Sequence, residues 1–176
     1  QVLPIYVAVN VSAVQLVRDD LAAIARSALE TSRLHGNRLM LELTESAIIA
    51  DPERSGRMLK QLKALDATIA MDDFGTGYSS LAYLQRLPID VLKIDRSFVT
   101  GMLADRDSVA IVRAILSLAS ALGMQTTAEG VETAELAQTL AALGCSYGQG
   151  YHFSRPLTAD DAFAYCRRAG IFTTLG

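Results

Sequence analysis

Strand-length apolar runs alternate with segments that carry helix signals, and this alternation constrains the fold more than any other feature. The apolar runs are Ile5–Val11, Leu39–Leu43, Ala67–Met71, Val91–Ile94, Met124–Ala128 and Ser146–Phe153. Between the runs, residues that favour helix N-caps precede helical sequence: Asp19, Asp51, Asp107, Thr133 and Thr158. Strands that alternate with helices in this way predict a parallel sheet covered by helices.

Two architectures contain such a sheet, an open doubly wound sheet and a closed (β/α)8 barrel. The chain has 176 residues, and this is about the length of one domain. A barrel normally needs about 250 residues and eight strands. If the fold is a barrel, we therefore expect an incomplete one with about six βα units, in a single domain over residues 1–176.

Each predicted strand carries a polar or charged side chain at or near its carboxyl end. In chain order these residues are Asn10, Glu42, Asp72 with Asp73, Lys93 followed by Asp95, Glu129 and Gln149. Both architectures bind ligands at this edge of the sheet. We therefore expect these side chains to meet in one functional site.

Four carboxylates and an asparagine dominate this set, and it contains neither histidine nor cysteine. Oxygen ligands of this kind favour Mg²⁺, Mn²⁺ or Ca²⁺ over zinc. The neighbouring carboxylates Asp72 and Asp73 suit a pair of ions about 3.5–4 Å apart. The pattern therefore predicts a two-metal site in which one aspartate of the pair bridges the ions and the other binds the second ion.

Structural explanations exist for each residue taken alone. An aspartate at a strand end often serves as a helix N-cap, and Lys93 could form a buried ion pair with Asp72 or Asp95. A lysine inside a barrel could also form a Schiff base. Carboxylates near Lys93 would raise its pKa, however, so we expect a cation that orients water or an anionic oxygen.

Composition excludes some partners and indicates a compartment. The formal net charge of −3 and the pI near 5.3 leave no basic surface of the kind that binds DNA. Cys145 and Cys166 form no CxxC pair, as expected of free thiols in a reducing compartment. We therefore expect a cytoplasmic domain, with any membrane anchor in an upstream segment.

Five motifs, in order along the chain, resemble those of the EAL-domain cyclic di-GMP phosphodiesterases. They are ELTES (42–46), DDFGTGYSS (72–80), LKIDRSFV (92–99), AEGVET (128–133) and QGYHFSRPL (149–157), and NVS at 10–12 fits an earlier asparagine motif of the family. The resemblance implies a modified (β/α)8 barrel. It also implies hydrolysis of cyclic di-GMP to linear pGpG with Mg²⁺ or Mn²⁺, and we expect Ca²⁺ to bind and inhibit.

The resemblance assigns a role to each site residue. As metal ligands it implies Asn10, Glu42, Asp72, Asp73 and Glu129. Lys93 is similar to the residue that positions the attacking water, and Glu45 to the glutamate that anchors the loop after Asp73. The residues expected near the substrate are Gln149, Glu132 and Asp95. The same resemblance implies a homodimer formed through the Asp73–Leu81 loop.

The Glu-Ala-Leu motif that names the family is expected upstream of Asn10, and this sequence does not contain it there. We therefore expect an N-terminally truncated EAL-type domain, with possible sensor or cyclase domains further upstream. Such a piece should be less active than the complete domain. The alternative function is a catalytically inactive cyclic di-GMP receptor or a protein-interaction module.

Overall fold

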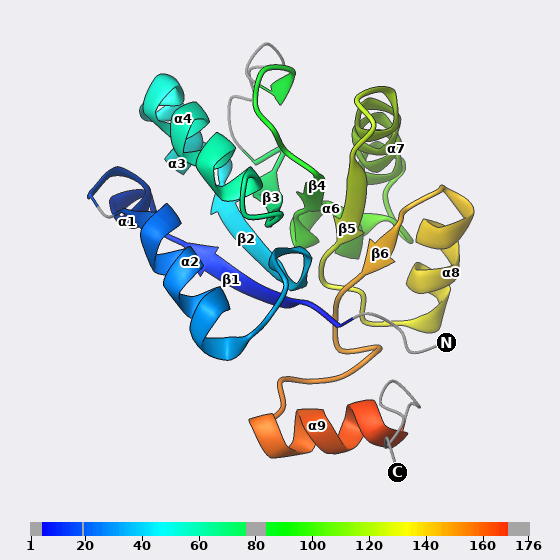
Figure 1. Ribbon diagram of the computed structural model, residues 1–176. Helices are drawn as coiled ribbons and strands as arrows, with labels where there is room; N and C mark the ends of the chain where they lie inside the picture. The colour runs from blue at the N-terminus through cyan, green and yellow to red at the C-terminus, as the bar shows by residue number, and fades with distance from the viewer. Residues whose placement is uncertain (1–4, 19, 77–83, 169–176) are drawn as a thin grey trace.

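The structure is a computed structural model, and it describes residues 5–18, 20–76 and 84–168 (Figure 1). Within these residues the strands are β1 (Val7–Val11), β2 (Leu39–Thr44), β3 (Thr68–Phe74), β4 (Val91–Ile94), β5 (Gln125–Ala128) and β6 (Tyr147–Gly148). They form a single sheet in the order β1-β2-β3-β4-β5-β6, and every neighbouring pair is parallel. Spatial order thus follows chain order.

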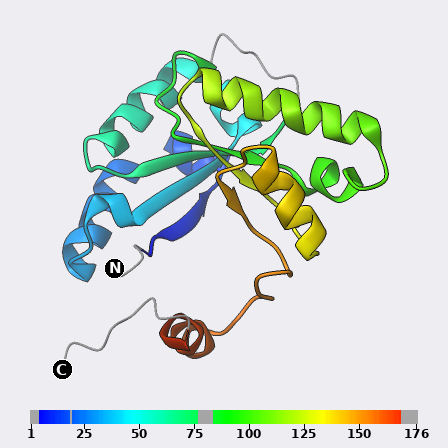
Figure 2. The ribbon, with the colours of Figure 1, turned by 90° about the vertical axis from the view of Figure 1, so that its right-hand side faces the viewer.

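Helical segments connect the strands. They are α1 (Ala13–Arg18), α2 (Leu21–Ser32), the 3-10 turn η1 (Gly36–Arg38), α3 (Glu45–Ile49), α4 (Pro52–Lys63), α6 (Arg96–Gly101), α7 (Arg106–Ala121), α8 (Ala134–Ala142) and α9 (Ala159–Arg168). Helices α2, α4, α7 and α8 flank the outside of a curved sheet, whereas α9 lies apart from the sheet in both views (Figures 1 and 2). Among the described residues, none of the helices is long and apolar enough to cross a bilayer.

Strand order distinguishes the two predicted architectures. A doubly wound sheet reverses its strand order at a switch point, but this sheet runs from β1 to β6 without a reversal. Sequential parallel strands with helices outside are the arrangement of a barrel wall. The prediction of an incomplete barrel with six βα units is therefore confirmed.

Alternation along each strand separates the core from the inner face of the curved sheet. Leu41, Ile69 and Leu92 belong to the main core, together with helix residues such as Leu59 and Val112. The strand residues one position away form a second, smaller cluster of Met40, Ala70 and Val91. Because side chains alternate between faces, each strand supports the helix layer with one face and builds the interior with the other.

The predicted element boundaries hold in part. Strand β4 is confirmed at both ends, β3 continues beyond the predicted Met71 to Phe74, and β6 is much shorter than the predicted Ser146–Phe153. Residues 151–153 form a turn there instead. Strand β6 ends where residues 149–152 begin to form hydrogen bonds with Val131 of the loop after β5.

Helix caps also divide into confirmed and corrected predictions. Asp51 and Thr133 cap α4 and α8 as predicted, and the Thr158 hydroxyl accepts from the Asp161 amide at the start of α9. Asp107 is wrong as the cap of α7, because Asp105 accepts hydrogen bonds from the Asp107 and Ser108 amides. Asp19 lies outside the described residues, and Asp20 caps α2.

Candidate active site

Lys93 lies at the centre of the carboxylates that end the middle strands. Its Nζ is 2.7 Å from Glu42 Oε2, 3.0 Å from Asp72 Oδ1 and 2.6 Å from Glu129 Oε1. Lys93 and Glu42 are both buried, with 4% and 8% of their surface exposed. Strands β2, β3, β4 and β5 therefore direct their charged side chains to one point on the inner face.

A β-bulge explains how two consecutive aspartates serve the same site. In a regular strand Asp72 and Asp73 would point to opposite faces. Between the pairs Met71–Leu92 and Phe74–Ile94, however, the register shifts, so that both aspartates lie opposite the single residue Lys93. Asp73 has a φ of 53°, in the left-handed region. This bulge re-aims the second carboxylate.

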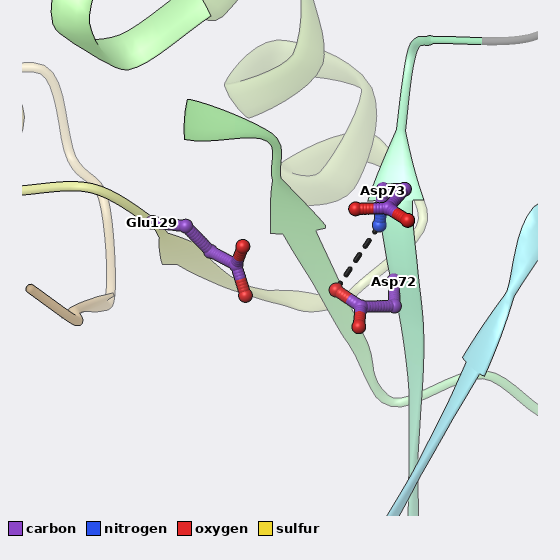
Figure 3. A group of neighbouring side chains, drawn as sticks. All are labelled: Asp72, Asp73 and Glu129. Carbon is purple, nitrogen blue, oxygen red and sulfur yellow. Dashed lines mark hydrogen bonds between the residues drawn. The ribbon is translucent and has the colours of Figure 1, made fainter. Parts of the chain in front are cut away.

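The bulge brings Asp73 into a cluster with Asp72 and Glu129 (Figure 3). One carboxylate oxygen from each of these residues lies within 4.8 Å of the other two. The Asp73 amide also donates a 3.1 Å hydrogen bond to Asp72 Oδ1, which holds the pair together. Convergent carboxylate oxygens at this spacing are the ligand type that Mg²⁺, Mn²⁺ and Ca²⁺ prefer.

Charge in the cluster is out of balance. Glu42, Asp72, Asp73 and Glu129 contribute four carboxylates, and Lys93 is the cation that contacts three of them. Burial alone would lower the pKa of Lys93, but the hydrogen bonds that its ammonium donates to Glu129, Glu42 and Asp72 outweigh burial and raise it. Lys93 is therefore a fixed ammonium, which disfavours the Schiff-base alternative.

Two of the carboxyl groups, Glu129 and Asp73, have raised pKa values, so their charged forms are disfavoured. Burial raises the pKa of Glu129 against the opposing effect of Lys93, and Asp72 and Glu42 raise it further. Burial also raises the pKa of Asp73, together with repulsion from Asp72 and Asp95. Divalent cations would relieve this excess of negative charge.

Three further predicted residues lie around the cluster. Asn10 stands in register with Glu42 across β1 and β2, so both side chains belong to the inner face. Glu45 is the first residue of α3 and is 7% exposed. Asp95 caps α6, accepting from the Ser97 amide at 2.9 Å, and hydrogen bonds from Ser97 lower its pKa.

The two predicted residues farthest along the chain lie on loops at the same edge. Gln149 directly follows β6, is exposed, and its amide donates to the Ala128 carbonyl at 2.8 Å. Glu132 is exposed in the loop before α8. The described residues thus place both next to β5, which ends beside Glu129.

Tyr6 is a neighbour of the site that the sequence did not indicate to us. Partial burial raises its pKa, and Tyr147 and Glu42 raise it further. The signal was present in the spacing, because Tyr6 lies four residues before Asn10 and strand alternation puts both on the same face.

Family membership agrees with this geometry. A family model described as "EAL domain" matches residues 2–156. The chain is 44% identical to the bifunctional diguanylate cyclase/cyclic di-GMP phosphodiesterase MucR of Pseudomonas aeruginosa, over 90% of this chain and 23% of MucR. It is also 44% identical to the cyclic di-GMP phosphodiesterase NbdA of the same organism, over 86% of this chain and 19% of NbdA. It thus spans less than a quarter of either relative.

Solved structures show the same likeness. The MucR phosphodiesterase in complex with cyclic di-GMP superposes with a TM-score of 0.85 at 44% identity, covering 89% of this chain and 64% of that one. BlrP1 of Klebsiella pneumoniae, with manganese and cyclic di-GMP, gives 0.79 at 32% identity, over 86% of this chain and 39% of that one. A calcium complex of BlrP1 gives 0.78 at 31% identity over the same shares. The resemblance predicted from the motifs is confirmed, and this chain belongs to the EAL domain family.

Proposed function

We propose that the protein containing this chain hydrolyses cyclic di-GMP to linear pGpG at the carboxyl ends of the barrel strands. The observation that carries the proposal is the convergence of Glu42, Asp72 and Glu129 on Lys93, with Asp73 turned to the same side by the bulge. The relatives named as cyclic di-GMP phosphodiesterases, MucR and NbdA, support this choice of substrate.

The residues present fit a pair of divalent cations, for which we propose Mg²⁺ or Mn²⁺. Asp72, Asp73 and Glu129 offer oxygens within 4.8 Å of one another, and Glu42 and Asn10 lie on the next two strands. When bound, the ions would activate a water and polarise the scissile phosphodiester. We also propose that Ca²⁺ binds there and inhibits, and the BlrP1 calcium complex is consistent with such binding.

Lys93 would contribute to the reaction separately from the metal ions. Its Nζ donates to three carboxylates on different strands, so the ammonium is held in one place before substrate enters. We assign it to orient the attacking water by a hydrogen bond, for which one of its three N–H groups would turn from a carboxylate to the water. A positive charge fixed at that position also favours the negative charge that develops on the phosphate oxygens.

The surrounding residues would position substrate and loops. Gln149 and Glu132 lie on exposed loops next to β5, and we assign both of them contacts with the substrate. Asp95 caps the start of α6, and we assign it a contact with the substrate at that turn. Glu45 is buried at the start of α3, and we assign it to anchor the loop after Asp73.

A substitution at Asp72 tests the function. In the protein with Mg²⁺, Asp72→Asn should lower kcat for cyclic di-GMP by about 10²–10³, because it removes a preorganised charge from the reacting centre. EDTA should abolish turnover by the unsubstituted protein. The matched control is Asp107→Asn, which changes the same chemical group at an exposed position in α7 and should leave kcat unchanged.

The outcomes separate the candidate functions. Turnover that persists in EDTA, or in Asp72→Asn, would contradict the two-metal proposal. Tight binding of cyclic di-GMP by the unsubstituted protein without any turnover would favour the receptor. Borohydride trapping of substrate on Lys93 would indicate Schiff-base chemistry instead.

We further propose that the chain is part of one EAL-type domain in a cytoplasmic, homodimeric protein. Free thiols at Cys145 and Cys166 are consistent with a reducing compartment. The dimer contact would be the Asp73–Leu81 loop, of which residues 77–81 lie outside the described residues, while Thr76 is exposed. Sedimentation velocity with Thr76→Arg would test the contact, since a charge added at a dimer interface should favour the monomer.

A further inference from the structure

The loops that follow β5 and β6 are joined through their backbones. Val131, in the loop after β5, donates its amide to the Gln149 carbonyl at 3.0 Å. Its carbonyl accepts from the His152 amide, also at 3.0 Å. Val131 is fully buried, with 0% of its surface exposed. Residues 149–152 thus close around one residue of the neighbouring loop.

Gly150 lies at the point of closest approach in this contact. A Cβ on Gly150 would lie 2.2 Å from the Val131 oxygen, 2.4 Å from its nitrogen and 2.7 Å from its carbonyl carbon. All three atoms belong to the backbone, so no side-chain rotation could make room for the added carbon. Gly150 is also absent from the glycines with positive φ. The need for glycine here is therefore contact with Val131 rather than backbone conformation.

Each of the joined loops carries a residue of the candidate active site. Glu129 lies two residues before Val131, its amide donates to the Ile94 carbonyl at 3.0 Å, and its carboxylate accepts from Lys93. Gln149 immediately precedes Gly150. The contact therefore sets how far the Gln149 side chain stands from a carboxylate of the cluster.

We propose that Gly150 is a positioning residue for the phosphodiesterase site: by letting the Val131 backbone lie against it, Gly150 fixes Gln149 relative to Glu129. The inference rests on the function proposed above. It goes beyond that function in predicting that ion binding through Glu129 and substrate binding through Gln149 weaken together when this one contact is opened.

Gly150→Ala is the direct test, and two other variants accompany it. Gly56→Ala is the matched control, because its Cβ would meet only Leu87 Cδ2 at 3.5 Å, an ordinary van der Waals distance, inside α4. Phe153→Ala removes a ring packed beside this contact without adding atoms. The Phe153 ring lies next to Gly148 and Val131, where a Cβ on Gly148 would meet it at 3.1 Å.

Three measurements on the protein report on the contact without turnover. Amide hydrogen exchange at Val131 and His152 reports the two backbone hydrogen bonds. Mn²⁺ titration alone reports ion binding, and cyclic di-GMP titration in Ca²⁺ reports substrate binding. In Gly150→Ala we expect lost protection at both amides and both dissociation constants raised about tenfold, the usual scale for residues that hold metal ligands in place.

Other results would overturn the inference. If Gly150→Ala folds by circular dichroism and keeps both dissociation constants, Gly150 has only a structural role. If it does not fold, Phe153→Ala decides. This variant should weaken the binding of both Mn²⁺ and cyclic di-GMP, to a smaller degree than Gly150→Ala would. Unchanged dissociation constants would contradict the proposal. Gly56→Ala should match the unsubstituted protein throughout. Should the unsubstituted protein bind neither Mn²⁺ nor cyclic di-GMP, the proposed function fails, and the exchange data still report on the contact.

Discussion

Asp73 occupies a backbone conformation that most residues avoid. Its φ of 53° lies in the left-handed region, which costs roughly 1–2 kcal/mol for an ordinary L-residue but less for aspartate and asparagine. The same conformation accommodates the bulge opposite Lys93 and turns the carboxylate toward Asp72. Strained backbone at a group of candidate ligands is typical of functional sites.

Two substitutions at Asp73 separate its charge from its conformation. Without metal, the free energy of unfolding of Asp73→Asn should be at least as large as that of the unsubstituted protein. Asparagine tolerates the left-handed region, and repulsion from Asp72 is lost. It should nevertheless bind Mn²⁺ at least about tenfold more weakly, as expected when a metal site loses part of its ligand shell. Asp73→Val should add a loss of about 1–2 kcal/mol in the free energy of unfolding.

Urea denaturation and Mn²⁺ titration measure these effects. Equal Mn²⁺ affinity in Asp73→Asn and the unsubstituted protein would show that Asp73 is no ligand. Equal stability of the valine and asparagine variants would show that the bulge relaxes in solution.

At the scale of elements, the two ends of the strands have different roles, one in the candidate site and one in stability. The carboxyl ends carry the candidate site, and the amino ends are tied together by Asp90. Its carboxylate accepts from Lys63 Nζ at 2.8 Å and from the Ile69 amide at 2.8 Å. Its amide donates to the Ile69 carbonyl, and its carbonyl accepts from the Gln125 amide, each at 2.9 Å. One residue therefore joins the beginnings of β3, β4 and β5.

Substitutions at Asp90 should change stability and leave the site intact. Asp90→Ala should lower the free energy of unfolding by about 1–3 kcal/mol, because the Ile69 amide loses its side-chain acceptor. Asp90→Asn keeps an acceptor and loses mainly an ion pair whose side chains are 34% and 35% exposed, so its loss of stability should stay below about 1 kcal/mol. Mn²⁺ affinity should be unchanged in both variants. An asparagine variant less stable than the alanine variant, or one with weakened Mn²⁺ binding, would contradict this separation.

Across the whole molecule, the candidate site concentrates negative charge that the fold does not neutralise. The pKa values of Glu129 and Asp73 are raised, first by burial and then by neighbouring carboxylates. In the folded state these groups therefore hold protons at pH values where the unfolded chain has released them. Stability must then fall as the pH rises from the ordinary carboxyl range toward the raised values.

Metal-free protein should accordingly have a lower Tm at pH 7 than at pH 5, and saturating Mn²⁺ should remove or reverse the difference. Asp95 and Asp105 act in the opposite direction, because hydrogen bonds lower their pKa values, but only below the ordinary range of aspartate. Calorimetry in EDTA and in Mn²⁺ measures both conditions. Glu129→Gln, which removes one carboxyl group with a raised pKa while keeping its shape, should flatten the pH dependence. A metal-free Tm that rises between pH 5 and pH 7 would contradict the interpretation.

Local sequence determined the order of strands and helices, a parallel sheet covered by helices and the residues of the carboxylate cluster, whereas the strand order of a barrel wall was settled by the tertiary structure. Hydrophobic runs, N-caps such as Asp51 and polar strand ends such as Glu42 act within a few residues, so they can be read from the chain. The same information could not choose between Asp105 and Asp107 as the cap of α7, since both are aspartates near the helix start.

Tertiary structure decided the features that depend on contacts between distant segments. The bulge at Asp73 exists because β3 pairs with β4 out of register there. The early end of β6 follows from the fit of Gly150 against Val131. In each case a backbone conformation is set by a partner about 20 residues away, and no pattern in the neighbouring sequence encodes that pairing energy.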